Sequence, residues 1–267
     1  MILERINLSE IFENIHLTAY LQHHPDAEAA MIICAGGGYL SLNEDEAEYV
    51  AIQFLAKGYQ TFILNHSVGA PYAHFPAPIK ELAHAVALVR ENATSYQVNP
   101  KRIYVCGLST GGHIASLLGA LWNEDVLELK NAFPAENVKP DAIILGYPVL
   151  DLDAFRTDLH HKGSKYAPFL DMMFTAILGT PHPDADALKK WNSISAISID
   201  TVPSFIWNYS NDEWVHKSQA EAYAKRLSSH NIPYKHLILS EGKHGDVKTL
   251  KDNNWIDQAV QWLNTLI

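Results

Sequence analysis

Residues 102–115, R-I-Y-V-C-G-L-S-T-G-G-H-I-A, constrain the fold and chemistry of this chain more than any other stretch. Ile103–Cys106 is apolar and partly β-branched, which predicts a buried strand. The residues after Thr110 are small and then apolar, which predicts a helix packed against a sheet. The G-x-S-x-G pentapeptide between them suits a tight strand-to-helix turn, because its glycines let strand and helix approach closely. Such a turn exposes a hydroxyl, so Ser109 is our candidate nucleophile.

The bulk properties of the chain fit a globular α/β domain. Its 267 residues are 48% hydrophobic and 19% charged, which is ordinary for a chain that buries a sizeable core. The formal net charge of −10 argues against a nucleic-acid partner, which would need a basic face. No apolar run approaches the roughly 18 residues of a membrane span, and the N-terminus lacks a signal-peptide pattern. We therefore expect a cytoplasmic protein with no membrane partner, and the sequence leaves open whether it forms a homo-oligomer.

Predicted strands alternate with predicted helices along the chain. The strands are expected at Leu3–Leu8, Ile15–Leu21, Ala30–Cys34, Thr61–Leu64, Ile103–Cys106, Ala142–Tyr147, Phe205–Tyr209 and His236–Leu239. Helices are expected after Asn43, where Glu46 completes a near capping box, and at Ile79–Val89, Thr110–Leu121, Lys217–Leu227 and Trp255–Leu266. The alternation predicts a single α/β domain over 1–267, with a mainly parallel sheet of about eight strands and helices on both faces. Residues 151–202 break the rhythm and are expected to form a small lid-like insertion.

Two polar residues stand where partners of a serine nucleophile would be needed. The strand Phe205–Tyr209 is followed by S-N-D-E-W-V, which contains Asp212, and the next strand by S-E-G-K-H-G, which contains His244. His244 would take the Ser109 proton, and Asp212 would hold the imidazole in the required tautomer. Glu213 and Asp246 are neighbouring carboxylates, but the loop position favours Asp212.

An oxyanion hole needs two backbone N–H groups. One is expected from Thr110, which follows the nucleophile, and the other from Gly37 or Gly38, in the glycine run after the strand Ala30–Cys34. A dinucleotide-binding loop is the competing interpretation of that run. It fails because G-x-G-x-x-G would require a glycine where Ser41 stands, and the strand Thr61–Leu64 ends in Asn65 and not in an acid.

Other polar residues near these motifs support weaker predictions. Tyr39 and Trp214 border the predicted site and could line an acyl or sugar pocket, or simply pack under a loop. The pairs His23-His24 and His160-His161 have no metal-ligand spacing, so no metal is expected. Cys34 and Cys106 are expected to be reduced and buried.

Five segments in order carry a resemblance to a known family. They are M-I-I-C-A-G-G-G-Y from Met31, G-L-S-T-G-G-H from Gly107, H-K-G-S from His161, D-E-W-V from Asp212 and E-G-K-H-G from Glu241. From about residue 30 onward the chain resembles the α/β-hydrolase branch of small bacterial acetylesterases and acetyl-xylan-esterase-like proteins. The resemblance implies the α/β-hydrolase fold, a triad of Ser109, Asp212 and His244, and an oxyanion hole of the Gly36–Gly38 run and Thr110.

The chain departs from the family pattern at three positions. Ala35 stands where proline or histidine is common, Thr110 where alanine is common, and His216 where proline is common. Because the oxyanion donors are backbone groups, the first two changes should leave catalysis possible, and Thr110 should narrow the acyl pocket. His216 has no explanation from the sequence.

The expected function is hydrolysis of short-chain carboxylic esters through an acyl-enzyme, with a small-molecule ester as substrate and no cofactor. The resemblance favours acetyl esters of sugars or xylo-oligosaccharides. We further predict that the insertion shapes the alcohol side of the pocket. An arylformamidase or peptidase-type amide hydrolase with the same triad is one alternative. A catalytically inactive binding protein of the α/β-hydrolase fold is another.

Overall fold

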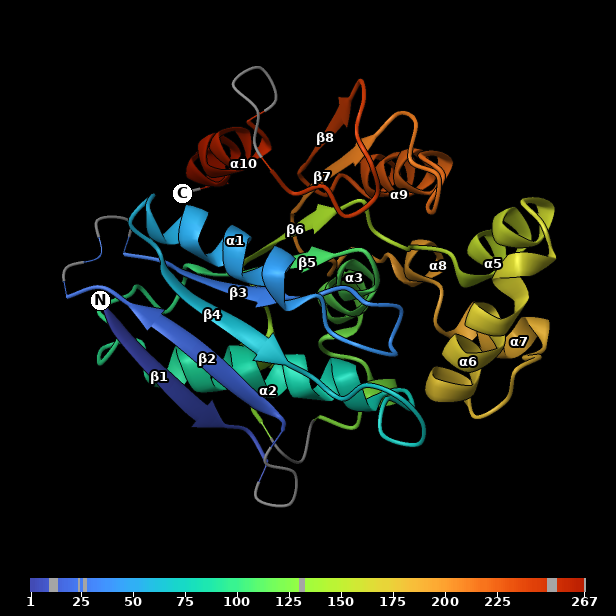
Figure 1. Ribbon diagram of the computed structural model, residues 1–267. Coiled ribbons are helices and arrows are strands. Elements are labelled where there is room, and N and C mark those ends of the chain that lie inside the picture. Colours follow the sequence, from blue (N-terminus) through green and yellow to red (C-terminus); the bar gives the residue numbers. More distant parts are fainter. Residues whose placement is uncertain (10–13, 24, 26–27, 130–132, 249–253, 267) are drawn as a thin grey trace.

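The central sheet has the predicted α/β architecture. A computed structural model of the chain describes residues 1–9, 14–23, 25, 28–129, 133–248 and 254–266 (Figure 1). Its strands are β1 Ile2–Asn7, β2 His16–Leu21, β3 Ala30–Cys34, β4 Gln60–Asn65, β5 Ile103–Leu108, β6 Ala142–Gly146, β7 Ser204–Tyr209 and β8 Tyr234–Leu239. They form one 8-stranded sheet in the order β1-β2-β4-β3-β5-β6-β7-β8. β2 pairs antiparallel with β1 and β4, and the remaining pairs are parallel, so the predicted mainly parallel sheet is confirmed.

Helices cover both faces of the sheet. They are α1 Glu44–Leu55, α2 Ala77–Glu91, α3 Thr110–Leu121, α4 Ala135–Val138, α5 Leu152–His161, α6 Ala167–Leu178, α7 Ala185–Lys190, α8 Ser193–Ala196, α9 Ser218–Ser229 and α10 Trp255–Leu263. Alternate residues of β3 enter different cores: Ile32 packs with α2, α3 and α9, whereas Met31 and Ile33 pack with α1 and α10. This period of two is what a strand buried on both faces requires.

The turn between β5 and α3 is packed directly against the end of β3. A Cβ atom on Gly111 would clash with the carbonyl oxygen of Cys34 and lie 2.5 Å from that of Ala35. Ser109 N–H donates to the Gly146 carbonyl at the end of β6, at 2.9 Å. The turn is therefore held between the carboxyl ends of β3 and β6, where the loops of a parallel sheet converge.

The segment between β6 and β7 contains α5, α6, α7 and α8, where the sequence predicted an interruption of the strand–helix rhythm. In Figure 1 these helices lie at the side of the molecule next to the carboxyl ends of β3 and β5. The apolar stretch from Phe169 to Leu178 belongs to α6, which begins at Ala167.

The predicted capping box at the start of α1 does not form. Asn43 occupies the N-cap position, as expected, but its side chain accepts no hydrogen bond from the helix. Its amide donates instead to the Glu46 carboxylate, which also accepts from the Tyr147 hydroxyl at 2.9 Å. Glu46 is thus turned toward the end of β6 and away from the helix terminus, a tertiary contact that local sequence does not encode.

No helix in the described part of the chain is long and apolar enough to cross a bilayer.

Substitution of Gly111 tests the close packing of the turn. Gly111→Ala would press a methyl group onto backbone atoms, and we expect it to lower the free energy of unfolding by about 1–3 kcal/mol. For Gly119→Ala, in the same helix, the nearest atoms are side-chain methyl groups of Val202 and Ile143, at 2.9 and 3.0 Å. Side-chain methyl groups give way more easily than backbone atoms, and alanine favours the helix by about 1 kcal/mol, so we expect a smaller loss. Equal losses in urea unfolding of the two variants would contradict this account.

Candidate active site

Ser109 sits in a strained conformation at the tip of the β5–α3 turn. Its φ of 53° and ψ of −116° lie in a region that residues with a Cβ atom rarely adopt. The strain turns the side chain out of the strand, and Oγ lies 2.8 Å from Nε2 of His244. Ser109 also directly precedes α3, whose first amide groups have no partner within the helix and attract negative charge.

The loops after β7 and β8 bring Asp212 and His244 together. His244 Nδ1 lies 2.8 Å from Oδ2 of Asp212, whose side chain is fully buried. The other carboxylate oxygen, Oδ1, accepts from the amides of Trp214 and Val215 at 2.8 and 3.0 Å. These bonds leave Asp212 a single orientation, with Oδ2 toward the imidazole. A continuous chain of hydrogen bonds therefore runs from Asp212 through His244 to Ser109.

The alternative acids do not take part in this chain. The Tyr209 hydroxyl donates to the backbone carbonyl of Asp246, which holds the loop after β8 in place. The backbone carbonyl of Glu213 accepts from Lys162. Asp212 is the carboxylate that contacts the imidazole, as its loop position predicted.

The glycine loop after β3 lies against Ser109. A Cβ on Gly36 would lie 2.8 Å from the Leu108 carbonyl oxygen and 2.9 Å from Cβ of Ser109, so only glycine fits beside the turn. Gly38 N–H donates to the Thr110 side-chain hydroxyl at 3.1 Å. Within the described residues, the Gly37 N–H donates to no protein group. Of the two glycines that the sequence offered as oxyanion donors, Gly37 therefore has an available N–H, whereas the Gly38 N–H is bonded to Thr110.

Tyr39 is not a wall of the cavity, although the sequence placed it at the border of the site. Its side chain is fully buried, and its hydroxyl lies 2.6 Å from Nδ1 of His113. His113 Nε2–H donates to the Trp191 carbonyl at 2.7 Å, so Nδ1 is the acceptor for the tyrosine hydroxyl. The left-handed φ of 62° at Tyr39 turns the ring inward. Tyr39 and His113 thus tie the glycine loop to α3 and to the segment before α8.

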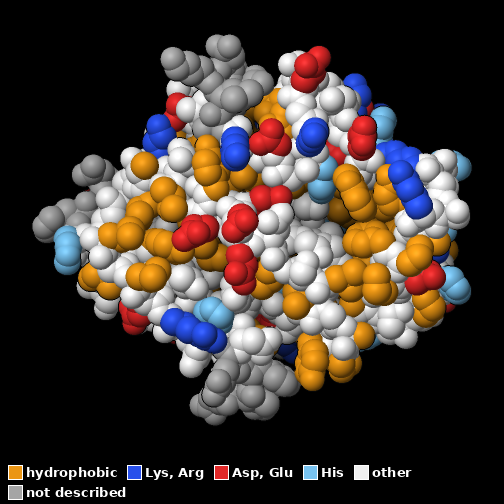
Figure 2. All heavy atoms as spheres, viewed as in Figure 1, with side chains coloured by type: hydrophobic (Ala, Val, Ile, Leu, Met, Phe, Trp, Pro, Cys, Tyr) orange, Lys and Arg blue, Asp and Glu red, His pale blue; other side chains and the backbone are white. Residues whose placement is uncertain are grey.

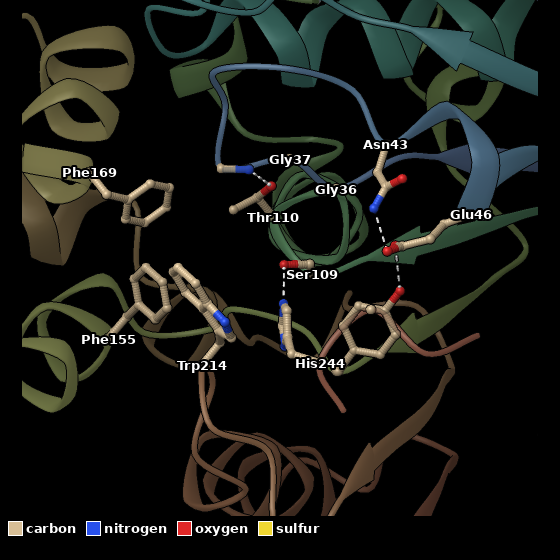
Figure 3. A pocket seen from close by; sticks show the side chains of 13 residues that line it. Gly36, Gly37, Asn43, Glu46, Ser109, Thr110, Phe155, Phe169, Trp214 and His244 are labelled. Carbon is tan, nitrogen blue, oxygen red and sulfur yellow. Dashed lines mark hydrogen bonds between the residues drawn. The ribbon is translucent and has the colours of Figure 1, made fainter. Parts of the chain in front are cut away.

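A cavity of about 230 Å³ opens over Ser109 and His244, and its two ends differ in chemistry. One end is an aromatic wall, which we define as Phe155 of α5, Phe169 of α6 and Trp214. The opposite end is an acceptor cluster, defined as Asn43, Glu46 and Tyr147. Figure 3 shows the Ser109 hydroxyl between the two ends. In Figure 2, hydrophobic side chains gather over α5 and α6, and acidic ones over the start of α1.

Sequence reasoning found Trp214 but missed most of this lining. Phe155 and Phe169 lie in the segment between β6 and β7, where no sequence motif marks them. The centroids of their rings are 6.5 Å apart. Glu46 looked like a helix-capping residue, whereas burial in the cavity raises the pKa of its carboxyl. Tyr147 could have been predicted to line the cavity, because it directly follows the parallel strand β6, as the other site residues follow theirs.

Two of the three departures from the family pattern make hydrogen bonds through their side chains. Ala35 is buried, and its backbone carbonyl lies 3.3 Å from Nε2 of His66, a contact that does not account for alanine at this position. Thr110 supplies the hydroxyl that holds Gly38, and His216 accepts through Nδ1 from the backbone N–H of Ser218 at the start of α9, at 3.3 Å.

No metal-binding group of three or more histidine, cysteine or acidic residues occurs in the part of the chain that the structure describes. His24, of the pair His23-His24, lies outside that part.

Known proteins resemble this chain in both sequence and fold. The family profile of BD-FAE matches residues 17–227. The acetyl ester-xyloside bifunctional hydrolase of Caldicellulosiruptor lactoaceticus is 29% identical, with a TM-score of 0.81 over 98% of this chain and 96% of that one. Endo-1,4-beta-xylanase B of Butyrivibrio fibrisolvens is 26% identical over 86% of this chain and 34% of its own length. An acetylxylan esterase of Xylanibacter ruminicola is 28% identical over 51% of this chain and 26% of its length.

The fold and the arrangement of residues at the strand ends are those of an α/β hydrolase. Within this class, the chain belongs to the BD-FAE family. It spans 26% to 47% of the length of the curated relatives that it matches.

Protonation of His113 should destabilise the fold in acid. Burial lowers the pKa of His113 from 6.5 to about 4. Between these values the unfolded chain binds a proton that the folded chain does not, so stability present above pH 6.5 is lost as the pH falls toward 4. Between pH 7.5 and pH 4.5 the free energy of unfolding should fall by about 2–3 kcal/mol less in His113→Gln than in the wild type, as measured by urea unfolding. Parallel pH curves for the two proteins would contradict a neutral, buried His113.

Proposed function

We propose that this protein is a serine esterase that hydrolyses short-chain carboxylic esters through an acyl-enzyme. The observation that carries the proposal is the chain of 2.8 Å contacts from Asp212 through His244 to Ser109, which ends in the cavity. A hydroxyl activated by an oriented imidazole, beside free backbone amides, is the arrangement that acyl transfer requires.

The proposed reaction has two halves, acylation of Ser109 and hydrolysis of the acyl-enzyme. Ser109 Oγ attacks the ester carbonyl carbon while His244 Nε2 takes the hydroxyl proton. The backbone N–H groups of Gly37 and Thr110 stabilise the oxyanion, and the buried Asp212 carboxylate stabilises the imidazolium. The C–O bond to the alcohol then breaks, and His244 returns the proton to the leaving oxygen. Water, deprotonated by His244, attacks the acyl-enzyme and releases the carboxylic acid and Ser109.

We propose acetyl esters of sugars or xylo-oligosaccharides as the substrate class. Two of the similar proteins carry acetyl ester or acetylxylan hydrolysis in their names. The cavity of about 230 Å³ is small, which favours a short acyl group. Thr110 further narrows the space beside the nucleophile, because its branched side chain is buried there.

The proposal extends to the arrangement and location of the protein. Residues 151–202 act as a lid-like insertion within a single domain, since Phe155 and Phe169 from this segment line the cavity. Both cysteines are buried free thiols, which fits a reducing compartment and hence the cytoplasm.

Ester hydrolysis by the wild type and Ser109→Ala tests the proposed activity. Removal of a triad nucleophile is expected to lower kcat for a chromogenic acetate ester by about 10⁴-fold or more. Among acetate, butyrate and octanoate esters, acetate should be cleaved fastest because the cavity is small. Equal rates for wild type and variant would contradict the triad, and faster hydrolysis of an aryl formamide than of any ester would favour the amide hydrolase instead.

Paired substitutions of Thr110 test how the glycine loop is held. Thr110→Val removes the acceptor for Gly38 N–H while keeping the side-chain shape, and we expect kcat for the acetate ester to fall about three- to tenfold. Thr110→Ser keeps the acceptor and should stay within about twofold of wild type. Higher activity in Thr110→Val would show that the threonine blocks Gly38 as an oxyanion donor, contrary to the assignment of Gly37.

A further inference from the structure

The acceptor cluster of the cavity has no role in the reaction steps above, yet it is built around a half-buried carboxylate. Glu46 Oε2 accepts from the Tyr147 hydroxyl at 2.9 Å, and Oε1 accepts from the Asn43 amide. A Cβ on Gly245 would lie 2.6 Å from Oε1, so the carboxylate is packed against the loop that carries His244. Glu46 is therefore held in one position at the rim of the reacting centre.

These contacts leave the cluster rich in acceptors. One N–H of the Asn43 amide and the O–H of Tyr147 already point at Glu46, as Figure 3 shows for Asn43, which leaves the second Asn43 N–H as the one remaining side-chain donor of these three residues. A carboxylate offers about four lone-pair sites, and an amide carbonyl and a phenol oxygen accept as well. Acceptor sites therefore outnumber donors here, and the cluster favours a ligand that brings hydrogen-bond donors.

The two parts of an acetyl ester differ in this respect. An acetyl group has no donor, and its methyl group is better matched by the aromatic wall of Phe155, Phe169 and Trp214 at the other end of the cavity. The hydroxyl groups of a polyol or sugar supply donors in the number and spacing that a carboxylate with a neighbouring amide can accept.

We propose that the acceptor cluster of Asn43, Glu46 and Tyr147 is a hydroxyl-binding subsite that holds the alcohol part of the ester. This inference rests on the proposed function and specifies its substrate as an ester of a hydroxyl-bearing alcohol. It places the acyl group against the aromatic wall. The insertion then borders the acyl side, and not the alcohol side that the sequence suggested.

A matched pair of acetate esters tests the proposal. Glycerol 1-acetate and propyl acetate share a three-carbon alcohol, but only the first carries free hydroxyls. We expect the wild type to prefer glycerol 1-acetate in kcat/KM. Glu46→Gln should lower kcat/KM for glycerol 1-acetate about tenfold and for propyl acetate less than about twofold. Glu44→Gln is the control, since Glu44 is exposed in the same helical turn and does not line the cavity.

Three outcomes overturn the inference. An equal fall for both esters in Glu46→Gln would mean that Glu46 acts through the neighbouring His244. A larger fall for acetylcholine, which has a cationic alcohol without donors, would make the cluster a cation site. An equal fall in kcat/KM for glycerol 1-acetate in Glu44→Gln and Glu46→Gln would mean that the change in net charge, and not the loss of the subsite, causes the effect.

Failure of the proposed function is separable from failure of this inference. If the wild type cleaves neither ester, the proposed esterase function is contradicted. The hydroxyl-binding subsite is then tested by a binding measurement. Methyl xyloside is then titrated into wild type and Glu46→Gln, with chemical shifts of the protein amides as readout. Binding that is lost in Glu46→Gln supports the hydroxyl subsite, and equal binding or none to wild type overturns it.

Discussion

The structure depends on the close approach of β5, α3 and β3 at the turn that carries Ser109. Backbone packs on backbone there, with Gly111 against the carbonyls of Cys34 and Ala35, and Gly36 against Ser109. At this contact Ser109 has a positive φ, and the glycine loop lies over its side chain. A looser turn would leave room for side chains but would lose both the exposed hydroxyl and the nearby amides.

Two buried hydrogen-bond networks hold the surrounding loops to this turn. On one side, Asp212 is fixed by the amides of its own loop and in turn fixes His244. On the other side, His113 connects Tyr39 of the glycine loop with Trp191. Because a buried polar group left without a partner is costly, each network constrains its members to one arrangement. The glycine loop, α3 and the segment before α8 are therefore positioned together.

Much of this arrangement follows from the sequence, for a physical reason. The carboxyl ends of parallel strands meet at one edge of a sheet, so Ser109, Asp212 and His244, each placed after a strand, were expected to converge. Trp214 follows the same rule. Local patterns of this kind encode chain direction and strand order, which are the features that set these positions.

The remaining features depend on tertiary contacts that local patterns do not contain. Glu46 has the spacing of a capping residue, and only contact with Tyr147 turns it into the cavity. Tyr39 adjoins the glycine run, but its backbone conformation points the ring inward to His113. Phe155 and Phe169 belong to an insertion without a motif, so their place in the wall depends on how α5 and α6 pack.

Covalent labelling with a fluorophosphonate, read by mass spectrometry of the intact protein and its peptides, tests the central claim most directly. The account predicts one phosphonyl group per chain on Ser109, and labelling that is at least 100-fold slower in His244→Ala, on the order of the loss expected when a nucleophile loses its base. Absence of label on folded wild type, or label on another residue, would contradict an activated serine at this turn.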